Sequence, residues 1–188
     1  MGPIEDRRVA RLRRGEPLAF DQVYDAFRPR VFSFLVRLCG QHPLAEDLLQ
    51  ETFLRLAKAA PTLAPDTRLG PWLFTVARNL FVSHRRWAVL DVARLSELSM
   101  FSRVQPTQPT PFAAVAASET ERLLEQAIAA LPLHYREVVL LCGIERLAPS
   151  EAASVLGLEP ATARKRLARA RAMIRASLTE SDGGEPSR

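Results

Sequence analysis

The residues best suited to binding a polyanion lie in two basic runs. Residues 160–178 contain six basic residues and no acidic one, and residues 67–90 contain four basic residues and again no acidic one. Together the runs hold ten of the 26 basic residues, so the rest of the chain is net acidic. A single run can be a solvated helix face, but two concentrated patches favour DNA or RNA bound at two places.

No constellation of residues indicates covalent catalysis. The three histidines, His42, His84 and His134, are isolated in sequence, and no glycine-rich loop could hold a phosphate. Cys39 and Cys142 are too far apart to suggest a metal pair. The sequence therefore predicts a protein that is not an enzyme and that needs no metal and no cofactor.

Helices are predicted to position the basic residues. Apolar residues recur at helical spacing, and alternating β-branched runs are nearly absent. The predicted fold class is therefore all-α. The expected helices span residues 16–27, 30–39, 44–59, 71–87, 119–130, 133–143, 149–156 and 160–177.

A proline-containing segment divides the chain. Residues 102–111, SRVQPTQPTP, hold three prolines and no apolar periodicity. We therefore expect two small helical domains, at 1–90 and 118–178, joined by a flexible linker at 91–117 and followed by a disordered tail at 179–188. No apolar stretch approaches the ~20 residues of a membrane helix, and the charged N-terminus is unlike a signal peptide. The expected location is cytoplasmic, without membrane insertion.

The C-terminal pattern predicts a helix-turn-helix. Pro149 suits a first helical position, Gly157 suits a left-handed turn, and Pro160 suits the start of a second helix. The inner faces would hold Ala152, Ala153, Val155 and Leu156 of the first helix and Ala163, Leu167, Ala170 and Ile174 of the second. The outward residues would be Thr162, Lys165, Arg166 and Arg169, with Arg164 and Ala168 beside them. Such a basic outer face can read the major groove; the alternative is a helical hairpin with a solvated basic face.

An acidic stripe is expected on the helix at 44–59. Asp47 and Glu51 are four residues apart, where like charges destabilise an isolated helix slightly. Acids near a helix N-terminus favour its dipole, which accounts for Glu46 and Asp47 but poorly for Glu51. The pattern therefore favours a stripe that binds a basic protein surface.

The helix at 71–87 has apolar residues on two faces, and either face could be the buried one. We expect the core residues to be Trp72, Leu73, Val76 and Leu80. A different face would then carry Phe74, Arg78, Phe81 and Arg85, with Asn79 and Arg86 alongside. Aromatics interleaved with arginines can stack on unpaired bases. In the alternative, the aromatics lie in the core and the arginines are merely solvated.

Three strings in order carry a family resemblance. The strings are AEDLLQETFLRLAKA, then GPWLFTVARNLFVSHRR, then ALPLHYREVVLL with LAPSEAASVLGLEPATARKRLARAR. The chain resembles bacterial sigma factors of the sigma-70 family, in the small extracytoplasmic-function (ECF) class, over roughly residues 16–90 and 119–178. The resemblance implies a protein that directs core RNA polymerase to promoters and helps to melt promoter DNA. It also implies an anti-sigma factor as a partner.

The resemblance implies a role for each group of residues. Asp47, Gln50 and Glu51 would bind the clamp coiled coil of the large polymerase subunit. Residues 63–70 and the helix at 71–87, with Arg78, Asn79, Arg85 and Arg86, would capture an unpaired base of the minus-10 element. The helix at 160–177 would read the minus-35 element. Ala148 stands where the family often has a capping Ser or Thr, so the helix start at Pro149 is expected to be weakly capped. Lys165 and Ala168 also depart from residues common in the family, so the promoter preference does not carry over.

Two other functions are compatible with parts of the sequence. A transcription regulator could bind duplex DNA through the helix-turn-helix without being a polymerase subunit, which would leave the acidic stripe and the second basic run unexplained. An enzyme acting on nucleic acid would require a metal-binding carboxylate cluster beside a basic patch, and neither patch has one.

Overall fold

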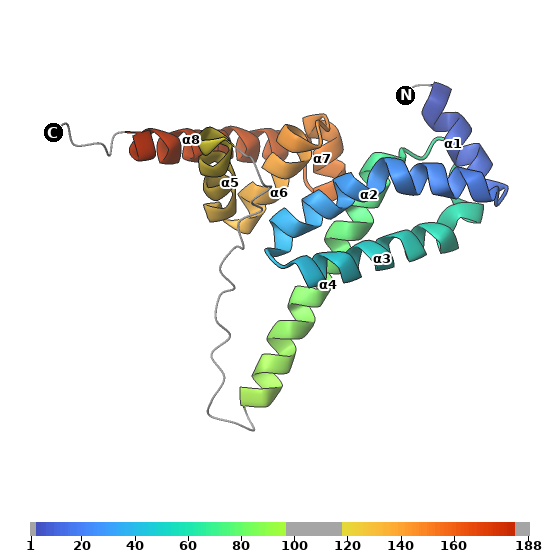
Figure 1. Cartoon of the computed structure of the whole chain (residues 1–188), viewed down its shortest axis with the longest axis horizontal. Helices are drawn as coiled ribbons and strands as arrows, with labels where there is room; N and C mark the ends of the chain where they lie inside the picture. Colours follow the sequence, from blue (N-terminus) through green and yellow to red (C-terminus); the bar gives the residue numbers. More distant parts are fainter. Residues whose placement is uncertain (1–2, 97–117, 183–188) are drawn as a thin grey trace. The chain divides into compact units, whose positions relative to one another are not determined.

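The computed structural model describes residues 3–96 and 118–182, and every regular element in these ranges is helical (Figure 1). The prediction of an all-α fold is confirmed. The chain divides into two compact units, one N-terminal and one C-terminal. Residues 97–117 of the predicted linker (91–117) and residues 183–188 of the predicted tail (179–188) lie outside the described residues.

The N-terminal unit contains five helical elements. They are α1 (Pro3–Arg13), α2 (Pro17–Cys39), α3 (His42–Ala59), the short 3-10 helix η1 (Ala60–Thr62) and α4 (Leu69–Ser96). Aromatic side chains join the longer helices. Phe53 of α3 lies edge-on to Tyr24 of α2, with ring centroids 4.7 Å apart, and Phe34 of α2 lies edge-on to Phe74 of α4 at 5.3 Å. Such edge-to-face pairs add to the area that the rings bury.

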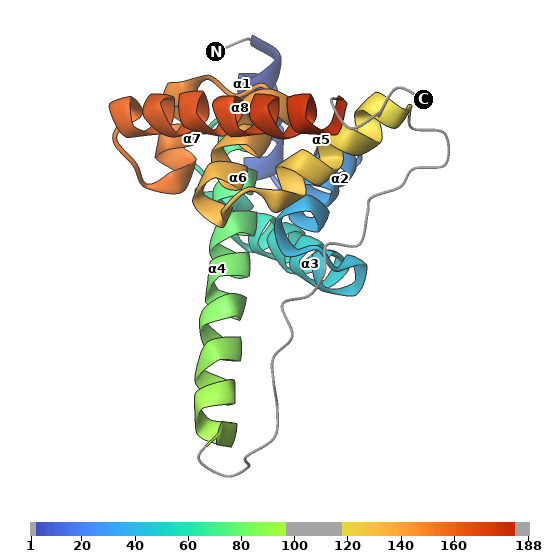
Figure 2. The ribbon, with the colours of Figure 1, turned by 90° about the vertical axis from the view of Figure 1, so that its left-hand side faces the viewer.

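The C-terminal unit is a bundle of shorter helices crossed by a long one. Its elements are α5 (Glu119–Ala130), α6 (Leu133–Val139), the π-helical turn η2 (Leu140–Ile144), α7 (Pro149–Leu156) and α8 (Pro160–Asp182). Helix α8 packs against α5, α6 and α7 (Figure 1, Figure 2). The Arg136 guanidinium of α6 donates to the carbonyl oxygens of Ala129 and Leu131, which ties α6 to the end of α5.

The structure corrects two expectations in the N-terminal unit. Helix α1 was not predicted, because its sequence is mostly charged and shows little apolar period. The expected helices at 16–27 and 30–39 are one helix, α2, which contains Pro29. A proline costs one backbone hydrogen bond. The helix nevertheless continues through the exposed Pro29, since Phe27 and Val31 on either side are buried.

Two helices are longer than expected. Helix α4 runs from Leu69 to Ser96 rather than over residues 71–87, and the part beyond residue 87 extends past the other helices of its unit (Figure 2). Helix α8 runs to Asp182 rather than to residue 177. The first six residues of the expected linker and the first four of the expected tail are therefore helical.

The turn between α7 and α8 has the predicted form. Gly157 has φ 64° and ψ 42°, the left-handed conformation. The Leu158 N–H donates to the Ala153 carbonyl at 2.9 Å and the Gly157 N–H to the Ser154 carbonyl at 3.3 Å. This pair of bonds closes the end of a helix and reverses the chain. At the start of α7 Ala148 has no side-chain acceptor, but the Glu151 carboxylate accepts from the Ala148 N–H at 2.7 Å.

The left-handed turn generates a prediction for stability. Replacing Gly157 by Ala should lower the free energy of unfolding by about 1–2 kcal/mol, because an L-residue at positive φ brings its Cβ against its own backbone. The added Cβ would contact no other part of the protein, since no atom outside Gly157 and its two chain neighbours lies within 4 Å of it. Urea unfolding of the whole chain measures the change.

Gly143→Ala provides the control for this substitution. Gly143 lies in the same unit at ordinary helical φ, where an added Cβ would meet Val139 at 3.8 Å. It should be neutral or slightly stabilising. Equal effects of the two substitutions would contradict the assignment of strain to Gly157.

Candidate nucleic-acid interface

Helix α8 turns one face to the core and the other to solvent. Its buried row is Ala163, Leu167, Ala170 and Ile174, as the spacing predicts, and α7 contributes the buried Ala152, Ala153, Val155 and Leu156. The small Ala153 and Ala163 side chains allow the two helices to approach closely, because each presents only a methyl group. In the N-terminal half of α8, the face opposite this buried row is exposed to solvent.

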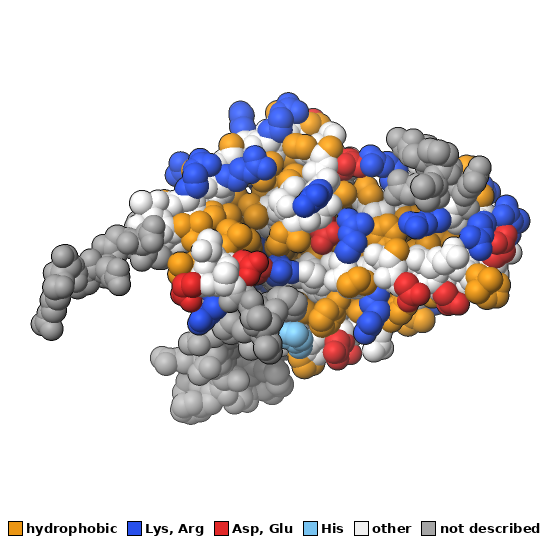
Figure 3. Space-filling model, turned by 45° about the horizontal axis from the view of Figure 1, so that its top comes forward, with side chains coloured by type: hydrophobic (Ala, Val, Ile, Leu, Met, Phe, Trp, Pro, Cys, Tyr) orange, Lys and Arg blue, Asp and Glu red, His pale blue; other side chains and the backbone are white. Residues whose placement is uncertain are grey.

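That outer face carries the predicted reading residues. Arg164, Lys165 and Arg169 are exposed, whereas Thr162 and Arg166 are half-buried. Lys and Arg side chains gather over this part of the molecule (Figure 3). Side chains at the start of such a helix can reach base edges in the major groove. Lys165 and Arg169 are four residues apart and so lie on the same side.

A second basic edge on α8 was not distinguished in the sequence. Arg171 and Arg175 are exposed and follow Arg164 by seven and eleven residues, so the three share one side of the helix. This side is turned away from Thr162 and Arg169. A row of arginines at this spacing can follow phosphates while the other edge meets bases.

The prediction of an exposed aromatic face on α4 is wrong. Phe74 and Phe81 were expected beside the arginines, but their side chains are 0% and 4% exposed. Phe74 packs on Phe34, and the Arg85 guanidinium lies over the Phe81 ring at 5.9 Å from its centroid. The two rings complete the core with Leu73 and are not available to stack on bases.

The rotation of α4 exposes a different stripe. Asn79, Arg85 and Arg86 are exposed and Arg78 is half-buried. Trp72, expected in the core, is only half-buried. Trp72, Asn79 and Arg86 are seven residues apart in turn, which places them on one side of the helix. Trp72 is therefore the aromatic residue that shares a side with Asn79, and sequence periodicity alone did not separate it from the core.

The acidic stripe on α3 is present but not entirely unpaired. Asp47 and Gln50 are exposed, whereas Glu51 is half-buried and its carboxylate accepts from Arg55 Nε at 2.9 Å. Glu51 thus has a cation one turn away, which reduces its repulsion of Asp47. Leu54 lies on the same face and is 54% exposed. An exposed leucine between polar residues is suited to contact with another protein, and the sequence analysis did not single it out.

The described residues show no group of His, Cys, Asp or Glu side chains that could hold a metal ion. Burial raises the pKa of the Cys142 thiol, which disfavours the reactive thiolate. Among the described helices none is long and apolar enough to cross a membrane.

Two segments of the chain match known sequence families. Residues 23–88, which include α3 and the Asn79 stripe, match the family described as Sigma-70 region 2. Residues 121–174, which include α7 and most of α8, match the family described as Sigma-70, region 4. The two matches cover the acidic face of α3, the Asn79 stripe of α4 and the basic residues of α8 from Arg164 to Arg171.

Whole proteins are similar over most of their length. The ECF RNA polymerase sigma factor SigW of Bacillus subtilis is 26% identical over 93% of this chain and 96% of its own length. The RNA polymerase sigma factor CarQ of Myxococcus xanthus is 32% identical over 92% of this chain and 96% of its own. The sigma factor RpoE, in its co-crystal structure with the anti-sigma factor NepR from Bartonella quintana, superposes with a TM-score of 0.69. It is 26% identical, over 85% of this chain and 96% of that chain.

The corrected position of the aromatics generates a prediction. Phe81→Ala should lower the free energy of unfolding by about 3–5 kcal/mol, because it removes a buried ring and leaves a cavity. Trp87→Ala, on the same helix and 62% exposed, should change it by less than about 0.5 kcal/mol. Thermal or urea unfolding distinguishes them. A small effect of Phe81→Ala would restore the expectation that this ring faces solvent.

Proposed function

The chain belongs to the ECF class of the sigma-70 family, and from this premise we propose how its two units share the work of transcription initiation. As a sigma factor it binds core RNA polymerase, directs it to specific promoters and assists promoter melting. The assignment of these steps to particular side chains is our proposal. The observation that supports this proposal most is that Asn79 of α4 faces solvent. The same chain has a second basic surface on α8.

The first assignment gives the minus-35 element to α8. Thr162, Arg164, Lys165, Arg166 and Arg169 form the proposed DNA-binding set, in which Lys165 and Arg169 are best placed for base edges and Arg164, on the other edge of the helix, for phosphates. Its support is the helix-turn-helix geometry at Gly157 and the solvent-facing basic positions that follow it.

Removing a base contact should affect promoters unequally. Lys165→Ala and Arg169→Ala should each weaken initiation at promoters that depend on the minus-35 element by about 1–3 kcal/mol, and relax discrimination at one base position. Arg175→Ala, which removes the same charge from the other edge of α8, should weaken all sequences alike or none. Transcription from a library of minus-35 variants is the measurement. A uniform loss in all three variants would mean that α8 contacts only phosphates.

The second assignment gives the minus-10 element to α4 and the loop before it. Asn79 would capture an unpaired base, with Trp72 beside it and Arg78, Arg85 and Arg86 near the phosphates. An amide can donate to and accept from a base edge, which suits recognition of an unstacked base.

Loss of this contact should act after initial binding. Asn79→Ala should reduce permanganate reactivity of the minus-10 thymines more than it reduces closed-complex binding, because an unpaired base is presented only after opening. Extruding one base costs a few kcal/mol, so the contact contributes where the DNA is already distorted. Ser83→Ala, one turn further along the exposed side, is the control. Parallel losses of binding and opening in Asn79→Ala would contradict this assignment.

The third assignment gives the polymerase contact to Asp47, Gln50 and Glu51 on α3. Asp47→Lys combined with Glu51→Lys should abolish association with core polymerase while the helical content is unchanged, because the reversed charges would oppose a basic partner surface. Pull-down of polymerase with circular dichroism of the same samples measures both. The matched control is Asp21→Lys with Asp25→Lys, an exposed acidic pair of the same spacing on α2. Recovery of polymerase at the wild-type level by the folded α3 variant would refute the contact.

We propose further that an anti-sigma factor holds the protein inactive, by analogy with the similar RpoE, which forms a complex with the anti-sigma factor NepR. We also propose that the protein works in the cytoplasm, where core polymerase acts, and that it performs no covalent chemistry itself.

A further inference from the structure

Helix α1 packs in the N-terminal unit, but none of the contacts proposed with DNA or polymerase involves it. An isolated helix of this length is marginal in water, so α1 must be held by contacts outside itself. Val9 and Leu12 are 0% and 2% exposed, and α1 packs against η1. The helix that begins the described chain thus touches the short element directly before the loop that leads into α4.

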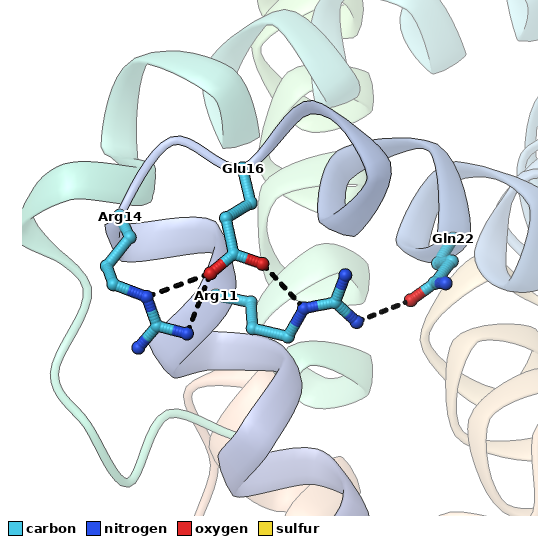
Figure 4. A network of polar contacts seen from close by, with 4 residues as sticks. All are labelled: Arg11, Arg14, Glu16 and Gln22. Carbon is cyan, nitrogen blue, oxygen red and sulfur yellow. Dashed lines mark hydrogen bonds and ion pairs between the residues drawn. The ribbon is translucent and has the colours of Figure 1, made fainter.

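The turn after α1 is closed by a backbone motif and a side-chain network. Gly15 has φ 68°, and the Glu16 N–H donates to the Arg11 carbonyl at 3.3 Å while the Gly15 N–H donates to the Leu12 carbonyl at 2.9 Å. The carboxylate of the same Glu16 accepts from Arg11 Nε at 2.8 Å (Figure 4). Arg11 and Glu16 are therefore joined through both the backbone and the side chains.

The network also reaches the next helix. Glu16 accepts from Arg14 Nε at 2.8 Å, and the Arg11 guanidinium donates to Gln22 Oε1 at 3.0 Å (Figure 4). The Glu16 carbonyl accepts from the Ala19 N–H at 2.9 Å, in the first turn of α2. Hydrogen bonds from Arg11 and then from Arg14 hold the pKa of the Glu16 carboxyl below its usual range. These contacts span the turn between α1 and α2.

The other end of the connection is the loop itself. Ala60 of η1 and the following Leu63 are both buried, and the Leu63 N–H donates to the Ala60 carbonyl at 3.4 Å. A tight turn follows, in which the Thr67 N–H donates to the Ala64 carbonyl at 3.0 Å, and α4 begins at the buried Leu69. A shift of η1 would therefore move residues 63–68, because few residues lie between the two buried anchors.

We propose that α1, oriented by the Arg11–Glu16 contact, is a positioning element that sets η1 and the loop at 63–68 for promoter opening. The proposal rests on the function above, since it concerns the loop assigned to the minus-10 base. Glu16 touches no DNA in this account; it acts through α1. The hydrogen bonds of the network in Figure 4 join α1, the turn after it and α2 and do not include a residue of α3, so their loss should affect opening and spare association.

The test uses the full chain with core polymerase and one promoter. Glu16→Arg reverses the charge that Arg11 and Arg14 contact, and Leu12→Ala loosens α1 by a different route. Glu119→Arg makes the same charge change on α5, where Glu119 pairs only at the surface with Arg122 at 3.3 Å. Hydrogen exchange at residues 8–13 reports whether α1 is released, and permanganate reactivity and pull-down report opening and polymerase association.

Release of α1 should lower opening by about three- to tenfold in both α1 variants, because a small misplacement of a reading group is costly. Association should be unchanged, and Glu119→Arg should behave as wild type. Wild-type opening with α1 released would overturn the proposal, as would a parallel loss of association, which would make α1 a general stabiliser of its unit. If the wild-type protein itself opened no promoter, the proposed function would fail instead, and the two failures are distinct.

Discussion

The burial of one face of α4 is the constraint on which the N-terminal unit depends. Phe74 and Phe81 are both turned into the core, where Phe74 meets Phe34 of α2. Once these rings are inside, helix geometry leaves no choice for the residues between them, and Asn79 faces solvent. The same rotation turns Arg86 outward and leaves Trp72 at the margin. Hydrophobic packing, rather than any polar contact, thus decides which side chains of α4 face solvent.

The C-terminal unit reaches a comparable result by backbone geometry. The left-handed Gly157 ends α7 and leads into α8, which packs against α7 with buried alanines on both helices. The basic residues of α8 are then left outside because the buried row is apolar and narrow. In both units the side chains proposed to bind DNA occupy positions that the core does not need. The same holds for the acidic α3 face with its exposed Leu54, which is proposed to contact polymerase.

The helix-turn-helix was predictable because its signals are local. Proline at each helix start, glycine at the turn and a single apolar row all agree, and the structure has each of them. The aromatic face of α4 was not predictable, because this helix has apolar residues on more than one side and periodicity cannot say which side a neighbour will cover. One residue that covers the buried side is Phe34 of α2, which stands 40 residues before its partner Phe74 in the chain. Helix α1 was missed for a related reason, since its few apolar residues, Val9 and Leu12 among them, are buried in its packing within the unit, and its mostly charged sequence did not indicate that packing.

The two proposed DNA-binding surfaces would become effective together when a polymerase fixes their spacing, which would raise the effective concentration of each on the same promoter. The most direct measurement is the affinity of the protein for promoter duplex, by filter binding over a range of salt concentrations, with and without core polymerase. We predict weak, strongly salt-dependent binding by the protein alone and tight, promoter-specific binding with core polymerase. Tight, sequence-specific duplex binding by the protein alone would contradict this account and would favour a regulator that works without polymerase.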